Sequence, residues 1–273
     1  MKTILVHVRH EAGPRFDALA DRLKALADQT APLVEAVTGL SLPDSVVIRT
    51  MTVRKWRAAH RRQDRVQLRG EARELRPARE ARRRAKAAAV GSRMSRRVVW
   101  PSIGAQVVDF HQRPEVVVLP QALREAGRLD DERVLQKILA HEMTHLAQYA
   151  IGNELWALMN TRYPEQRGIS DRDYSFALEG HAYWADREIT TKILGAPVPT
   201  AEISPHATLR YRALAETPQR NEHLRYFNSA ADSVGKIIEV RGFDAFNRLW
   251  TTPDLVPLTT ETGRPELWLR RFQ

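Results

Sequence analysis

Between positions 131 and 150, two histidines one helical turn apart interrupt a regular apolar pattern. The apolar residues recur every three or four positions, as on one side of an α-helix: Val134, Leu135, Ile138, Leu139, Met143 and Leu146. Acidic residues at 130–132 suit a helix N-terminus. The sequence therefore predicts a helix from about Asp131 to Ala150, on which His141 and His145 project from the same side.

Glu142 lies inside the apolar arc of this predicted helix, whereas Lys137, Thr144 and Gln148 fall on the opposite side. A carboxylate among apolar neighbours is costly unless it has a partner. A water molecule bound to a metal ion would be such a partner, and Glu142 would then act as its general base. The alternative is a chance grouping of surface residues.

A zinc site with two histidines needs a third protein ligand, and the chain contains no cysteine. A second predicted helix, from about Tyr174 to Leu194, carries Glu179 and His181. Glu179 falls at the centre of its apolar arc, but His181 falls on the outer side. We therefore expect His141, His145 and Glu179 to bind one Zn²⁺ ion, and the helix-weakening Gly180 suggests the close approach of another element.

Two further residues of the second helix could assist the site. Asp186, two turns after Glu179, could orient a ligand histidine, or it could form an ion pair with a nearby arginine. Tyr183 could donate a hydrogen bond to a developing oxyanion, or it could be an ordinary core tyrosine. The same donor role is open for His206, Tyr211, His223 and Tyr226.

The motif from His141 to His145, followed by Glu179-Gly180-His181-Ala182, resembles the gluzincin branch of the zincin metallopeptidases. It looks closest to the bacterial zinicin-like and minigluzincin families. The resemblance implies a compact α+β fold, zinc, and attack of an activated water on a peptide carbonyl. It covers about residues 120–194.

The rest of the chain fits an α+β fold of zincin type, with a small sheet packed on the motif helix and a helical C-terminal region. A helix is predicted at 14–37, a strand at 45–53, and an extended pair at 97–110 and 115–119. We expect a helix-and-strand part at 1–119 and a zinc-site part at 120–273, together forming one compact unit. An edge strand beside the site could hold an extended peptide, although the sequence does not show which strand is the edge.

The segment 53–97 holds 17 arginines or lysines against 4 acidic residues, a net charge of +13. The whole chain carries +10, so the remainder carries −3. The segment is predicted to be helical, with interruptions near Gly70 and Pro77. Its charge could serve an acidic partner or nucleic acid, with Trp56 and His60 available for base stacking, or it could be a solvated surface.

The absence of cysteine, of a signal-like segment and of a membrane-spanning apolar run predicts a cytoplasmic protein without a membrane partner. The predicted function is a zinc metallopeptidase that hydrolyses a peptide or protein. The alternatives are a nucleic-acid-associated protein that uses 53–97, with a structural or vestigial zinc site, and a hydrolase acting on a non-peptide amide.

Overall fold

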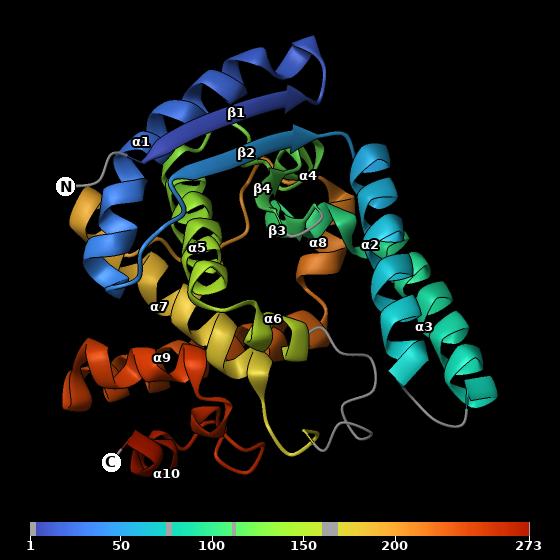
Figure 1. Ribbon diagram of the computed structural model, residues 1–273. Helices are drawn as coiled ribbons and strands as arrows, with labels where there is room; N and C mark the ends of the chain where they lie inside the picture. Colours follow the sequence, from blue (N-terminus) through green and yellow to red (C-terminus); the bar gives the residue numbers. More distant parts are fainter. Residues whose placement is uncertain (1–3, 75–77, 111–112, 160–168, 273) are drawn as a thin grey trace.

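A four-stranded mixed sheet forms one layer of the computed structural model, which describes residues 4–74, 78–110, 113–159 and 169–272 (Figure 1). The strands are β1 (Leu5–Glu11), β2 (Ser45–Met51), β3 (Ala105–Asp109) and β4 (Pro114–Val118), in the order β1-β2-β4-β3. β1, β2 and β4 run parallel, and β3 pairs antiparallel with β4 at one edge. This sheet and the helices around it confirm the predicted α+β class.

One strand was missed, and two strand predictions need correction. β1 was not predicted, because its sequence is short and carries polar residues on both faces. The extended segment predicted at 97–110 is a strand only from Ala105, since α3 (Ala78–Val99) and a 3-10 turn at Trp100–Ser102 occupy its first half. The predicted strand 45–53 ends at Met51, before α2 (Val53–Glu74) begins.

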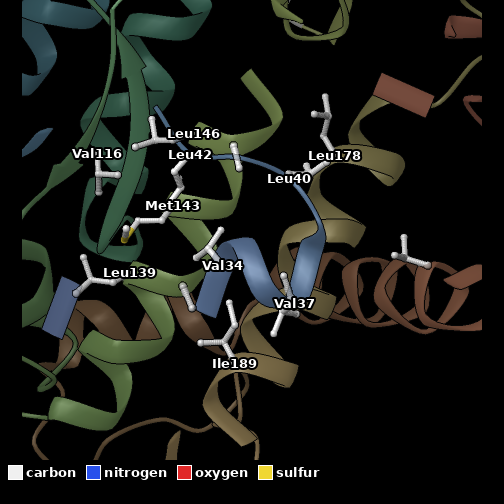
Figure 2. Packing of buried hydrophobic residues seen from close by; sticks show 14 of the residues in the cluster. Val34, Val37, Leu40, Leu42, Val116, Leu139, Met143, Leu146, Leu178 and Ile189 are labelled. Atoms are coloured by element: carbon white, nitrogen blue, oxygen red, sulfur yellow. The ribbon is translucent and has the colours of Figure 1, made fainter. Parts of the chain in front are cut away.

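The central helix is α5 (Glu132–Ile151), which packs against the sheet, α1 (Asp17–Thr38) and α7 (Tyr174–Leu194). α1 connects the parallel strands β1 and β2. Figure 2 shows Leu139 and Met143 of α5 close to Val34 of α1, among side chains that are fully buried. The predicted helices 14–37, 131–150 and 174–194 agree with these elements, except that Pro14–Phe16 forms a 3-10 turn before α1.

Helix α9 (Pro218–Asn247) crosses α7 at Gly180. A Cβ atom at Gly180 would lie 2.9 Å from the carbonyl carbon and from Cβ of Ala230, so only glycine permits this approach. The remaining helices are short: α4 (Pro120–Glu125), α6 (Asn153–Met159), α8 (Leu209–Ala215) and α10 (Pro265–Leu269). One hydrophobic core contains residues from Val6 to Phe272 and so joins both halves of the chain.

α2 and α3 form a basic hairpin that extends away from the sheet (Figure 1). α2 continues through Gly70, so the predicted interruption there is wrong, and Pro77 lies outside the described residues. Near the base of the hairpin, Asp64 pairs with Arg96. Trp56 is fully buried and donates from Nε1 to Gln106, and His60 is 9% exposed, so neither is available to stack on bases.

Among the described helices, none combines the length and the apolar character needed to cross a membrane.

Candidate metal centre

Helices α5 and α7 bring together the three predicted ligands. Asp131 caps the N-terminus of α5, because its side chain accepts a hydrogen bond from the main-chain N–H of Val134. The helix places His141 and His145 with ring centroids 4.8 Å apart. From α7, Oε2 of Glu179 lies 3.4 Å from Nε2 of His141 and 3.7 Å from Nε2 of His145. One ligand atom from each residue thus lies within 4.8 Å of the others, a grouping that could hold a metal ion.

Both histidines are fixed through the ring nitrogen that faces away from Glu179. Nδ1 of His141 donates to Oδ2 of Asp186 at 3.2 Å, because a carboxylate can only accept. Nδ1 of His145 lies 2.8 Å from the amide oxygen of Gln148, which likewise accepts. With Nδ1 bonded in each ring, Nε2 is the nitrogen that each histidine can offer to a metal ion, and it loses its proton when it binds one. The donor set and its orientation fit a zinc ion.

Gln148 and His181 were both assigned to outer faces by the sequence, and both assignments are wrong. Gln148 is 1% exposed and His181 is fully buried. The amide nitrogen of Gln148 donates to Leu178 O and to Nδ1 of His181, each at 3.0 Å. Burial, followed by the charge of His145, lowers the pKa of His181 to about 3, so this imidazole is a neutral acceptor in the support of His145.

The helical wheel of α5 was also wrong about Lys137 and Thr144, which are buried. A wheel assumes one solvent-facing side, but α5 is enclosed by α1, the sheet and α7. Lys137 reaches Val198 O at 2.8 Å and Thr200 Oγ1 at 2.5 Å, and its Nζ lies 3.3 Å from Oδ1 of Asp186. Asp186 therefore contacts both a candidate ligand and a buried cation, and its ion-pair partner is a lysine.

Glu142 lies beside the three ligands and is 7% exposed, as its place in the apolar arc predicts. Burial raises the pKa of its carboxyl group above the ordinary value, against the charges of His141 and His145. The main-chain N–H of Val107, on strand β3, faces this carboxylate and lowers its pKa in part. Glu142 thus lies between α5, which carries it, and the edge strand β3.

The site concentrates negative charge. Burial disfavours the charged form of His141, but hydrogen bonds to Asp186 and Glu179 and the nearby carboxylates raise its pKa to about 10. Burial likewise opposes ionisation of Glu179, yet the two histidines lower its pKa below the ordinary value. Glu142, Glu179 and Asp186 together create a field that favours a cation at this position.

A cavity of about 480 Å³ opens over the candidate ligands, and residues 104–107 of the β3 region line one wall. Tyr183 lines it as well, with its ring 4.7 Å from that of His141 and stacked on Phe227. Burial, with the charges of Glu179 and Asp186, raises the pKa of Tyr183, which therefore keeps its hydroxyl proton.

Of the other predicted donors, Tyr211 is among the residues lining this cavity, whereas His206, His223 and Tyr226 are not. Tyr226 instead packs on Phe176, and His223 packs on Phe227. Arg220 also lines the cavity and was not predicted. It is one of 36 arginines in a chain rich in this residue, so no local pattern distinguished it.

Comparison with solved structures finds a protein from Chloroflexus aurantiacus, described as a candidate hydrolase with a novel fold. The two chains superpose with a TM-score of 0.59 at 18% identity, over 95% of this chain and 91% of that chain. At this identity the similarity shows a shared fold. No protein-family model matches the chain, and a search of curated proteins finds no match.

Proposed function

We propose that this chain is a zinc-dependent metallopeptidase of the gluzincin type. The observation that carries the proposal is the grouping of His141, His145 and Glu179, with both histidines oriented through Nδ1. Three protein ligands from histidine and glutamate are the donor set of catalytic zinc sites, which keep a fourth position open. A description of the Chloroflexus protein as a candidate hydrolase is compatible with this class.

Zinc, when bound by these ligands, supplies Lewis-acid chemistry that polarises a carbonyl and lowers the pKa of water. Glu142 accepts the proton of the attacking water at its carboxylate and then gives it to the leaving amine. Its buried position beside the candidate ligands, with a pKa raised by that burial, suits a general base. Tyr183 and Tyr211 carry hydroxyl groups in the same cavity and are the candidates for the oxyanion donor.

The position of β3 favours an extended peptide as substrate. Gly104 O accepts from Leu119 N, on the β4 side, whereas Val107 N–H is directed at Glu142. Because main-chain groups alternate along an antiparallel strand, Ala105 and Val107 face away from β4. An extended peptide could therefore add to this edge by main-chain hydrogen bonds, within the cavity.

The test measures zinc per chain by mass spectrometry and hydrolysis of a mixed peptide library, before and after chelation. We expect about one zinc per chain in the wild type, weakened zinc binding in Glu179→Ala, and activity reduced about 10²–10⁴-fold in Glu142→Gln with zinc retained. Full zinc affinity in Glu179→Ala would show that Glu179 is not the third ligand. Full activity in Glu142→Gln would show that Glu142 is not the general base. A library that stays intact while simple amides are cleaved would favour the non-peptide alternative.

The basic hairpin supports a second candidate function, the binding of nucleic acid. It projects from the body of the molecule, and around Arg57 the positive charges of Arg97, Arg210 and Arg61 add to burial in lowering the pKa of that guanidinium. Such a cluster attracts phosphates without base recognition. The test is binding to DNA and RNA at several salt concentrations, with Arg82, Arg83 and Arg84 neutralised together; an absence of binding at low salt would exclude this function.

A further inference from the structure

A second cavity, of about 310 Å³, adjoins the one over the candidate metal centre. It is lined by the segment 200–203, by α8 and by the first turns of α9. The two cavities share four lining residues: Thr200, Glu202, Tyr211 and Arg220. A substrate held over the metal centre could therefore extend one group into this side cavity, whose volume suits an amino-acid side chain or a chain terminus.

Among the described residues at this junction, Arg220 is the cation that has neither a hydrogen-bond acceptor nor an ion-pair partner for its side chain. Lys137 is satisfied by Asp186, Val198 O and Thr200, and Arg128 by Asp131 and Glu202. Arg220 is half-buried, yet within the described ranges of the chain its side chain makes no hydrogen bond or ion pair. A partly desolvated guanidinium without an acceptor is unfavourable unless a ligand supplies the negative charge.

Tyr211 provides a second donor at the same place. Its side chain is half-buried and lines both cavities, and its hydroxyl has no hydrogen-bond partner among the residues that the structure describes. A guanidinium donates two parallel hydrogen bonds to a carboxylate, and a phenol can donate a third. This pair of side chains is chemically suited to a carboxylate rather than to an apolar or cationic group.

Two acidic residues also line the side cavity, and neither cancels the charge of Arg220. Glu202 lies 3.9 Å from Arg128, which offsets its charge. Glu216 is exposed to solvent and forms no ion pair with Arg220, although it stands four positions earlier in the chain. In the main cavity, Glu142 and Glu179 face the candidate metal centre, where a divalent ion would balance them.

We propose that Arg220 and Tyr211 form a carboxylate-binding subsite and that Arg220 determines substrate specificity. The chain would then prefer peptides that place a carboxylate next to the scissile bond, either an acidic side chain or the free C-terminus. This inference rests on the proposed peptidase function, because it names the substrate class of the same site. Arg220 binds the substrate carboxylate in this proposal, whereas Glu142 transfers the proton.

Hydrolysis tests the inference with pairs of peptides that differ only in charge. One pair exchanges Glu for Gln at each position near the scissile bond, and a second pair compares a free C-terminus with its amide. The wild type should favour one carboxylate member by about 10–100-fold in kcat/KM, mainly through KM, because a charged hydrogen bond is lost in its neutral counterpart. The pair that shows the preference identifies the source of the carboxylate.

In Arg220→Gln, the ratio of kcat/KM between the carboxylate peptide and its neutral counterpart should fall to about one. The matched control is Arg225→Gln, which removes an exposed arginine from the same helix and should keep the wild-type preference. Folding should tolerate both changes, since Arg220 is the third residue of α9, where a positive charge is not stabilised by the helix dipole. An equal fall in kcat on all peptides in Arg220→Gln would mean a transition-state donor and would overturn the specificity role.

A binding measurement separates this inference from the peptidase proposal. N-acetylglutamate and its neutral analogue N-acetylglutamine are titrated into the full chain after chelation, so that no metal can hold the carboxylate, and binding is followed by NMR. We expect chemical-shift changes with N-acetylglutamate in the wild type and Arg225→Gln, and their loss in Arg220→Gln. Binding of this kind without peptide cleavage would refute only the peptidase, whereas equal responses to both compounds would refute the subsite. A preference for basic peptides that Glu216→Gln abolishes would also overturn it.

Discussion

The side-chain amide of Gln148 lies 3.0 Å from Nδ1 of His181, and these two buried residues link α5 to α7 behind the candidate metal centre. The oxygen of the same amide accepts from His145, so one glutamine fixes the ring orientation of a candidate ligand and is itself fixed by a neutral imidazole. The geometry of the candidate metal centre therefore depends on residues that are not themselves candidate ligands.

Replacing Gln148 with methionine should weaken zinc binding about 10–100-fold, because His145 loses the acceptor that orients it. The measurement is zinc affinity by competition with a chromophoric chelator. Gln136→Met is the matched control: Gln136 is a buried glutamine on the same helix that bonds to Thr30, away from the site. Unchanged zinc affinity in Gln148→Met would show that His145 needs no such support.

Asp186→Asn should also lower zinc affinity about 10–100-fold. Asparagine has nearly the same volume, but it loses the charge that pairs with Lys137 and accepts more weakly from Nδ1 of His141. Asp232→Asn serves as control, since Asp232 is 71% exposed and pairs with Arg187 on the surface. Equal zinc affinities for the two variants would argue that Asp186 only balances Lys137.

Gly180→Ala should destabilise the fold by about 1–3 kcal/mol, because the added methyl group would overlap the main chain of Ala230. Gly70→Ala provides the opposite case. Gly70 is also helical, but a Cβ there meets nothing within 4 Å, so alanine should stabilise the protein by up to about 1 kcal/mol. Denaturant unfolding of the two variants measures the change in the free energy of unfolding, which should be opposite in sign. A stabilised Gly180→Ala would contradict the close packing of α7 on α9.

Arg49→Met should destabilise the sheet in a pH-dependent way. Arg49 bonds to Glu115 at 2.6 Å and to Glu11 at 2.5 Å. Burial opposes ionisation of Glu11, but hydrogen bonds from Lys55 and Arg49 outweigh it and hold the pKa of that carboxyl below its ordinary value. A carboxylate with a lowered pKa contributes stability above its unfolded-state pKa, about 4.3, and loses it as the pH falls through the folded-state pKa.

The free energy of unfolding should therefore differ between wild type and Arg49→Met by about 1–3 kcal/mol at pH 7, and by less below pH 4. Denaturant titrations at both pH values measure this difference. Lys24→Met is the control, because its ion pair with Asp28 is exposed and should contribute less than about 1 kcal/mol. A difference in the free energy of unfolding that grows as the pH falls would contradict the role assigned to Glu11.

The sequence determined the local elements of the site. Helical periodicity located α5 and α7 to within a residue, and it placed Glu142 on the buried side, because a helix fixes which residues share a face. The choice of Glu179 over His181 followed from the same periodicity, and the structure brings Glu179 to the two histidines. The resemblance to gluzincins added the chemistry expected of that group, which the periodicity alone does not supply.

Tertiary structure decided what surrounds each face. Because α5 is enclosed on several sides, Lys137, Thr144 and Gln148 are buried although a wheel places them opposite the apolar arc. The short strand β1, the edge position of β3 and the side cavity at Arg220 depend on contacts between segments far apart in the chain. Local periodicity carries no information about such contacts, so the candidate ligands could be predicted, whereas their hydrogen-bonded support and the arginine without an ion-pair partner among the described residues could not.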